Sequence, residues 1–439
     1  MLPVEGQQAR VAVPEKQGEV SVYQRVKKTA WIVILWGLPA GLSAQDLSQY
    51  TSFTIAGKSV QAHGFFSQGF VDTNQNNWLT MGTNGGSFAM TEGGINLSSQ
   101  LTDKFRVGAQ VYDRDFGQLG KWHPELDWAV ADYRFKPWFG VRGGKIKTTL
   151  GLFNDTQDMD FLHTFALLPQ SVYPTDMRDD TLSHTGGDVY GTVGLPIRLG
   201  SLSYTGYAGG TQKSIYGGYP YLLQVHGIYI NKSGGLTWGG DLRWNTPLKG
   251  LLAGASYNDS DLRNTGTLNP SVALGGPDVS VPYWEASRRQ FTQQFYGEYV
   301  LGNLRIDSEY RRFWRDFTIF NGQFEATINP NSWYTSVAYR VSKRLELGAY
   351  YSHFAIYWIV TVPGQIEAPS VSSPDRHLYD KVVTARVDVT RNVYVKVEGH
   401  FMDGYGGDAM YPDGFYWQVN PQGIKPNTNG LIVRTGYNF

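Results

Sequence analysis

The residues of this chain that could act together are charged side chains gathered between Leu150 and His184. This segment carries one arginine, Arg178, against a set of aspartates: Asp155, Asp158, Asp160, Asp176, Asp179 and Asp180. The chain has no Gly-x-Ser-x-Gly elbow, no His-Glu-x-x-His helix among its 8 histidines, and no cysteine to serve as nucleophile or zinc ligand. The segment therefore favours an electrostatic role over bond-making catalysis, and nothing in the sequence predicts a cofactor or a metal.

Elements of secondary structure must position these carboxylates. The sequence indicates β-strands, because apolar and polar residues alternate along many of its segments. From Val393 to Phe401 aliphatic and aromatic residues occupy one parity, while Lys396, Glu398 and His400 occupy the other. Charge on one face and apolar residues on the other suit a strand with water on one side and lipid on the other. A strand of a soluble sandwich gives the same local pattern, so the number and spacing of such segments must decide.

Sixteen segments alternate in this way. They lie near residues 60–71, 87–98, 104–115, 126–136, 139–150, 185–195, 200–210, 235–245, 250–258, 291–301, 303–315, 332–341, 344–354, 379–389, 392–403 and 430–439. Short connections, such as 136–137 and 342–343, alternate with long ones rich in Gly, Pro, Asn and Asp, such as 72–86, 259–290, 355–378 and 404–429. Outer-membrane barrels have short periplasmic turns and long outer loops. The sequence thus predicts an all-β fold, a transmembrane antiparallel barrel of sixteen strands.

Composition agrees with this prediction. Only 17% of residues are charged and 14% are aromatic, with 28 Tyr and 52 Gly, yet the mean hydropathy of -0.32 is too low for a helical membrane protein. The formal net charge is +0, which gives no electrostatic support for binding nucleic acid.

The N-terminal region predicts export. Arg25, Lys27 and Lys28 precede an apolar run, Thr29–Leu42, which is too short to span a bilayer comfortably and ends at a small residue, Ala44. We expect a cleaved signal peptide over 1–44, with an uncleaved anchor as the alternative and a start codon placed too far upstream as the reason for the long polar leader. The rest divides into a short periplasmic segment, 45–59, and the barrel, 60–439.

The last strand ends in an aromatic residue. Tyr437 and Phe439 share one parity with apolar residues before them, whereas Arg434 lies on the other. This pattern looks like the recognition tail that the barrel-assembly machinery reads in outer-membrane proteins; the alternative is an ordinary edge strand that ends at Phe. It also predicts that the final strand closes the barrel.

The alternation assigns faces, because a charge on the lipid face costs a few kcal/mol near the bilayer midplane. Phe295, Tyr299, Ile306 and Tyr310 are expected to face lipid. The residues expected to face the lumen are Glu92, Asn96, Arg106, Gln110, Asp241, Arg243, Glu298, Arg305, Asp307, Glu309, Arg311, Arg340, Glu346, Arg386, Asp388, Lys396, Glu398 and Arg434. Interfacial girdles are expected from Trp128, Trp138, Trp244, Trp333, Tyr339, Tyr351 and Tyr437, with a sugar slide lining the pore as the alternative.

Several stretches resemble a group of Gram-negative porins of the sixteen-stranded type, and the resemblance covers nearly all of 60–439. They are AHGFFSQGF, EGGINLSSQLTDKFRVGAQVYDRDFG, LDWAVADYRF and GGKIKTTLGLFNDTQDMDF, the last of which is also similar to phosphate-selective porins. The resemblance implies a homotrimer in outer-membrane lipid. It further implies that the third outer loop, about 151–184, folds into the lumen as a constriction.

These expectations combine into a hypothesis for the pore. Asp155, Asp158, Asp160 and Asp176 on the loop would face a wall that bears Arg106, Arg142, Arg305, Arg311 and Arg340. The resulting transverse field would orient small hydrophilic solutes and ions and exclude apolar ones, as in a general porin. Four alternatives stay open: a loop outside the barrel that binds surface cations, an anion- or phosphate-selective porin supported by Lys145 and Lys147, an outer-membrane barrel hydrolase, and a purely structural or adhesive barrel.

Overall fold

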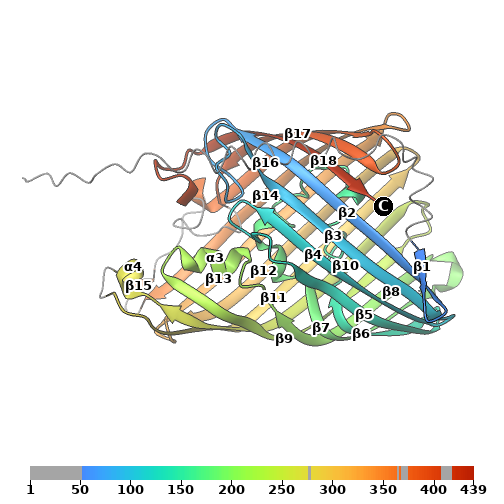
Figure 1. The fold of residues 1–439 in the computed structure, drawn as a ribbon, viewed down its shortest axis with the longest axis horizontal. Coiled ribbons are helices and arrows are strands. Elements are labelled where there is room, and N and C mark those ends of the chain that lie inside the picture. The colour runs from blue at the N-terminus through green and yellow to red at the C-terminus, as the bar shows by residue number, and fades with distance from the viewer. Residues whose placement is uncertain (1–51, 275–277, 363–364, 367–373, 407–417) are drawn as a thin grey trace, which may run out of the picture. The chain divides into compact units, whose positions relative to one another are not determined.

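The computed structural model describes residues 52–439, except 275–277, 363–364, 367–373 and 407–417 (Figure 1). The expected signal peptide, 1–44, and residues 45–51 of the expected periplasmic segment lie outside the described residues and remain predictions. Within the described residues, no helix combines the length and the apolar character needed to cross a membrane.

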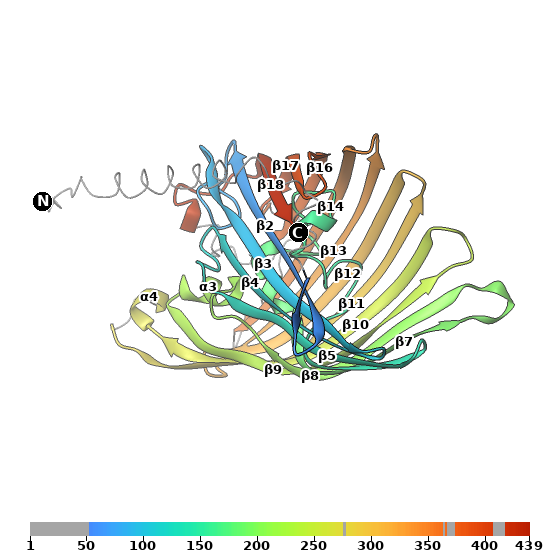
Figure 2. The same cartoon turned by 45° about the vertical axis from the view of Figure 1, so that its right-hand side comes forward.

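The described chain folds into sixteen long antiparallel strands, each paired with the next (Figures 1 and 2). They are β2 (Lys58–Thr73), β3 (Ser87–Thr102), β4 (Phe105–Phe116), β5 (Glu125–Lys136), β6 (Phe139–Lys147), β7 (Ser183–Gly194), β8 (Ser201–Gln212), β9 (Ile228–Asn245), β10 (Leu251–Leu268), β11 (Val281–Leu301), β12 (Leu304–Ile319), β13 (Phe324–Arg340), β14 (Leu345–Val362), β16 (His377–Asp388), β17 (Val393–Gly404) and β18 (Asn427–Asn438). Two short strands, β1 (Ser52–Ile55) and β15 (Gln365–Ile366), pair with β2 and β14. Each of the sixteen predicted segments overlaps one long strand, so the predicted fold class is confirmed.

The barrel closes where its first and last long strands meet. β18 pairs with β2 over a register that runs from Gly430↔Thr73 to Asn438↔Phe65. Beyond it, the backbone N–H of Phe439 donates to the carbonyl of Gly64 at 3.0 Å, and the N–H of Gly64 donates back at 3.2 Å. Closure satisfies the backbone donors and acceptors that an open edge would leave exposed to lipid.

The two faces of the strands differ as the alternation predicts. On β17 the side chains of Lys396 and Glu398 are 0% exposed and point into the interior, whereas Val397 and Phe401 are 46% and 51% exposed on the outside. Phe295 and Tyr310 are also exposed on the outer face. Because the backbone alternates sides at every residue, these strands can carry many charges while they keep an apolar surface toward lipid.

The strands of one wall extend further on the outer side than the sequence indicates. The prediction of a loop over 259–290 is wrong, because β10 continues to Leu268 and β11 begins at Val281. The extension is polar, since residues such as Asp261 and Arg263 leave the apolar alternation. Backbone pairing continues there because the hairpin buries one face, on which Leu268 and Tyr283 belong to a hydrophobic cluster, while polar residues such as Asp261 lie on the other.

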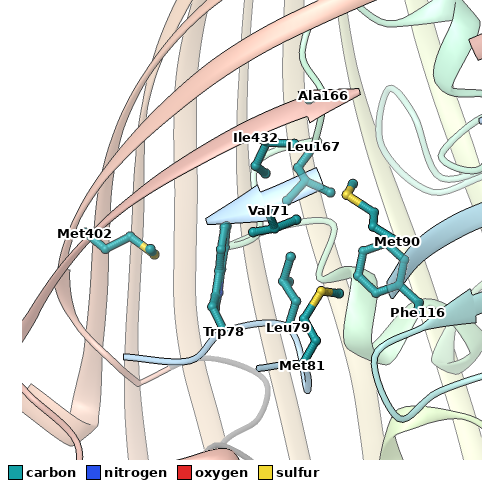
Figure 3. Packing of buried hydrophobic residues seen from close by; sticks show 10 residues of the cluster. All are labelled: Val71, Trp78, Leu79, Met81, Met90, Phe116, Ala166, Leu167, Met402 and Ile432. Carbon is teal, nitrogen blue, oxygen red and sulfur yellow. The ribbon is translucent and has the colours of Figure 1, made fainter. Parts of the chain in front are cut away.

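A hydrophobic cluster inside the barrel joins two connections that are far apart in the sequence (Figure 3). It consists of Val71, Trp78, Leu79, Met81, Met90, Phe116, Ala166, Leu167, Met402 and Ile432. Trp78, Leu79 and Met81 come from the connection after β2, while Ala166 and Leu167 come from the connection after β6. Their burial holds the second connection inside the barrel, because the apolar side chains lose contact with water there.

Candidate constriction site in the lumen

The connection after β6, residues 148–182, turns into the lumen, and we call it the lumen loop. It contains two short 3-10 helices, η1 (Asp160–Leu162) and η2 (Thr175–Asp180). Inward side chains from distant strands bind it: Glu309 of β12 accepts from the N–H of Leu152 at 3.0 Å, and Glu398 of β17 accepts from Ala166 and Leu167 at 2.8 and 3.0 Å. The prediction that this segment folds into the lumen is therefore confirmed.

Glu309 anchors the first part of the lumen loop. Besides the N–H of Leu152, its carboxylate accepts hydrogen bonds from the hydroxyls of Tyr173 at 2.7 Å and Tyr334 at 2.6 Å, and from the amide of Gln294 at 2.6 Å. A buried carboxylate with this many donors is stable only while all of them stay in place. The anchor thus fixes two points of the loop, Leu152 and Tyr173, against β12.

Asp160 anchors the middle of the lumen loop to β17 and β18. Its carboxylate lies 2.5 Å from the Nζ of Lys396 and 3.1 Å from the Nε of Arg434, and it accepts from the hydroxyl of Tyr394 at 2.7 Å. Burial alone would raise the pKa of Asp160, but the charges of Arg434 and Lys396 outweigh it, so the pKa lies below its ordinary value. This carboxylate therefore acts as a charged tie between the loop and the wall.

Asp158 forms a second ion-paired contact between the loop and the wall, at β5 and β6. It pairs with Lys147 of β6 at 2.6 Å and with Arg178 of the lumen loop at 3.4 Å. Asp127 of β5 shares both cations, at 2.8 Å and 2.9 Å. Burial would raise the pKa of Asp158, but Lys147 and Arg178 outweigh it and lower the pKa. Lys147, considered a possible phosphate ligand, is held by carboxylates here.

His163 is a titratable group of the loop that sequence reasoning missed as part of the site. Its Nε2 hydrogen-bonds to the carbonyl of Thr156 at 2.9 Å, and its ring packs edge-on against Phe153. Burial lowers the pKa of His163 to about 4. The ring is therefore neutral near pH 7.

Asp155 lies beside two of the expected arginines. Together with Arg106 of β4 and Arg142 of β6 it lines a cavity of about 210 Å³ between the loop and the periplasmic half of the wall. Arg142 also pairs with Asp188 at 2.7 Å, whereas Arg106 has no ion pair within the described residues. Burial raises the pKa of Asp155, and Arg243 offsets this only in part.

Two other expected arginines line a second cavity, of about 240 Å³, near the short turns that join β11 to β12 and β13 to β14. Arg305 pairs with Glu298 at 2.6 Å and Asp307 at 3.0 Å, and Arg340 pairs with Glu346 and with Asp388 at 3.0 Å. Arg386 also lines this cavity and pairs with Asp388 at 2.9 Å, so each of its three arginines has a carboxylate partner.

The remaining expected residues lie apart from these cavities. Asp176 is buried in η2. Arg311 of β12 contacts the lumen loop through a carbonyl, because its NH1 donates to Val172 O at 2.7 Å. The set of residues expected to face one another across a single constriction is therefore spread over several places around the loop.

Tryptophans divide between the two faces of the barrel. Trp138 and Trp244 are exposed outside near the periplasmic turns, where a girdle is expected. The assignment of Trp128 to a girdle is wrong, since it lines the lumen cavity with Arg106 and Asp132. Asp127, the extra residue of a bulge in β5, shifts the local parity and turns Trp128 inward.

One hydroxyl–imidazole–carboxylate contact bears on the hydrolase alternative. His184 lies with its Nδ1 3.0 Å from the hydroxyl of Thr148 and its Nε2 2.8 Å from Asp188. All three side chains are buried, and the roles of the two ring nitrogens are the reverse of those in a serine-protease triad. This geometry gives a substrate no access to the hydroxyl and suits a structural hydrogen bond.

Comparison with known proteins shows the fold and no closer relationship. Scans of the sequence against protein-family models and against curated proteins find no match. The outer-membrane expressed OmpT of Vibrio cholerae superposes with a TM-score of 0.51 at 12% identity, covering 88% of this chain and 100% of that chain. OmpF of Salmonella typhi, solved in complex with daunomycin, gives 0.50 at 12% identity with the same coverage. The chain therefore has the closed sixteen-stranded barrel fold of outer-membrane porin structures.

Proposed function

We propose that this protein is an outer-membrane porin, a water-filled channel through which small hydrophilic solutes and ions diffuse passively. The observation that carries the proposal is the lumen loop, which wall residues as far apart as Glu309 and Glu398 hold inside the barrel by its backbone N–H groups. A fixed loop between polar cavities narrows a path without the moving parts that an active transporter needs. The porin-like fold supports the proposal.

Selectivity in this proposal is weak. Most loop carboxylates are paired with wall cations, as Asp158 and Asp160 are. The transverse field expected from the sequence is then confined to one place, where Asp155 shares a cavity with Arg106 and Arg142. Opposite charges across a cavity orient a polar solute, but a single partly buried carboxylate opposite two arginines discriminates little between small ions.

Planar bilayers test the channel. Purified protein is expected to insert with discrete conductance steps, and native protein is expected to show a small reversal potential in a KCl gradient. Asp155→Asn should shift the reversal potential toward anion preference, whereas the matched variant Asp103→Asn, whose side chain is exposed in the turn between β3 and β4, should shift it less. Absence of any stepwise conductance would refute the channel.

The assembly state and route are also proposals. We expect a homotrimer, as the porin resemblance implies. Chemical cross-linking of detergent-extracted protein should then give bands at one, two and three times the monomer mass and none larger. We expect the barrel-assembly machinery to read Tyr437 and Phe439, so Phe439→Ala should reduce the folded fraction in the outer membrane, while Phe439→Trp should retain it. Mass spectrometry of the mature protein should place its N-terminus near residue 45 if the signal peptide is cleaved.

A further inference from the structure

A small cavity on the outer side of the lumen loop has an unusual charge. It measures about 40 Å³ and lies between the loop and the outer halves of β10–β12. Four cationic side chains line it, and only one carboxylate does, that of Asp180. The cations are Arg178, Lys213, Arg311 and Arg315. Three arginines and one carboxylate line the cavity near Arg305, and four cations and two carboxylates line the one beside Asp155, so this cavity has the largest excess of cations of the three.

The four cations are not equally neutralised. Arg178 pairs with three carboxylates, those of Asp127 at 2.9 Å, Asp179 at 3.1 Å and Asp158 at 3.4 Å. Lys213 pairs with Asp180 at 3.0 Å, and Arg315 pairs with Glu285 at 3.2 Å. Arg311 donates to the carbonyl of Val172 and lies over the ring of Phe313 at 5.9 Å, but within the described residues it has no carboxylate partner. Arg311 therefore contributes a positive charge that the protein itself does not cancel.

Two guanidinium groups at this cavity also keep an unused donor. The Nε atoms of Arg178 and Arg311 are buried, and neither has a hydrogen-bond partner within the described residues. The side chain of Arg178 is only 5% exposed and its other nitrogens are engaged, with NH2 donating to Asp127 at 2.9 Å. Buried donors without acceptors cost free energy, so a group that enters the cavity and accepts from them would recover part of that cost.

We propose that this cavity binds one compact oxyanion, the carboxylate or phosphate group of a solute that enters from the outer side, between Arg178 and Arg311. Planar guanidinium donors suit such oxygens, and paired donors hold them more firmly than a single amine does. A space of about 40 Å³ holds about three waters, which matches one such group and excludes a sugar ring. The inference rests on the proposed channel for the route of entry and adds a binding step before the constriction.

The test combines binding and conductance on the purified full-length protein. Inorganic phosphate and acetate are titrated calorimetrically into the detergent-solubilised barrel, and each is then added to one side of a planar bilayer. Native protein is expected to bind phosphate and to show a phosphate-dependent drop in current from the outer side. Arg311→Gln should weaken phosphate binding about tenfold, the range expected for one charge-assisted hydrogen bond.

The neighbouring arginine supplies the control. Arg312 lies on the same strand but on the outer face, over the ring of Trp314 at 5.8 Å, so Arg312→Gln should leave phosphate binding unchanged. Arg311→Lys keeps the positive charge but not the planar pair of guanidinium donors, so phosphate affinity should fall about threefold. This variant replaces Arg311→Gln if the glutamine variant fails to assemble. Equal phosphate affinity in native protein and in either Arg311 variant would overturn the inference.

The two proposals fail in different ways. If channels conduct but neither phosphate nor acetate binds or blocks, the oxyanion site is refuted and the channel stands. If phosphate binds with the expected dependence on Arg311 but no channel forms, the site stands and the proposed function is refuted. A preference for phosphate over acetate, or the reverse, identifies which oxyanion the cavity takes.

Discussion

Two parts of the lumen loop meet the same kind of wall in opposite ways. Around Asp160 the loop offers a carboxylate and the wall offers Lys396 and Arg434, so the charges pair at 2.5 and 3.1 Å. Around Val172 the loop offers only a carbonyl, and Arg311 keeps its charge. Paired buried charges hold a structure because either partner alone is costly, whereas an uncancelled cation remains able to bind a ligand. Ion pairs thus anchor the loop at Asp160, whereas at Val172 the loop leaves Arg311 the charge on which the proposed oxyanion site depends.

The largest effect is expected from breaking the anchor at Asp160. Lys396→Met removes an ammonium group that is 0% exposed and donates to Asp160 and to the carbonyl of Phe165. Loss of one partner of a buried pair should destabilise the folded barrel by about 4 kcal/mol and free the middle of the loop. Thermal unfolding should occur at a lower temperature, and single-channel conductance should rise.

The matched control for that variant is Lys381→Met. Lys381 lies on the neighbouring strand β16 with its side chain exposed on the outer face. It should leave both readouts close to native. If the two lysine variants behave alike, the ion pair with Asp160 does not hold the loop.

Acid should loosen the same part of the loop through His163. Its folded pKa of about 4 lies below the unfolded value of about 6.5, so the unfolded chain binds the proton first as the pH falls. Stabilisation by the neutral ring is complete above pH ~6.5 and is lost as the pH falls to about 4, up to about 3 kcal/mol. Thermal unfolding measured across this window should show the decline in native protein and a shallower one in His163→Gln. An identical slope in both proteins would exclude His163 as its source.

A smaller effect is expected at the anchor on β12. Glu309→Gln replaces an acceptor of several hydrogen bonds by an amide that also donates, which conflicts with the hydroxyls of Tyr173 and Tyr334. We expect a loss of about 2 kcal/mol and a noisier open channel, measured by unfolding and by current fluctuations. Glu298→Gln, whose carboxylate is partly exposed beside Arg305, should change both less.

The smallest effect on stability is expected at a wall charge that is accessible to solvent. Arg305 is 34% exposed and pairs with Glu298 and Asp307, so solvent screens these interactions. Arg305→Gln should cost less than about 1 kcal/mol and should shift the reversal potential slightly toward cation preference. A shift larger than that of Asp155→Asn would mean that the periplasmic cavity near β12, and not the one beside Arg106, controls selectivity.

The sequence by itself determined the barrel and its faces. Strand positions, the inward orientation of Lys396 and Glu398, closure at Phe439 and the inward path of the loop could all be predicted, the last through the porin resemblance. Alternation works because it is local: each residue faces the side opposite its neighbour, and lipid excludes charge from one side. The prediction of faces was wrong at the bulge beside Trp128, because the extra residue shifts the alternation there. The prediction of strand ends was wrong in β10, whose extension lies beyond the apolar alternation that lipid imposes.

Only the tertiary structure decided which charges meet. Asp160 and Lys396 are separated by 236 residues, and nothing in the spacing of either indicates the other. Alternation shows that a side chain points inward, but its partner depends on the path of a loop across the lumen, which the packing of Leu167 with Trp78 and similar contacts sets. The sequence predicts a single field between loop carboxylates and wall arginines. In the structure Asp158 and Asp160 instead form ion pairs with wall cations, and Arg311 keeps an uncancelled positive charge.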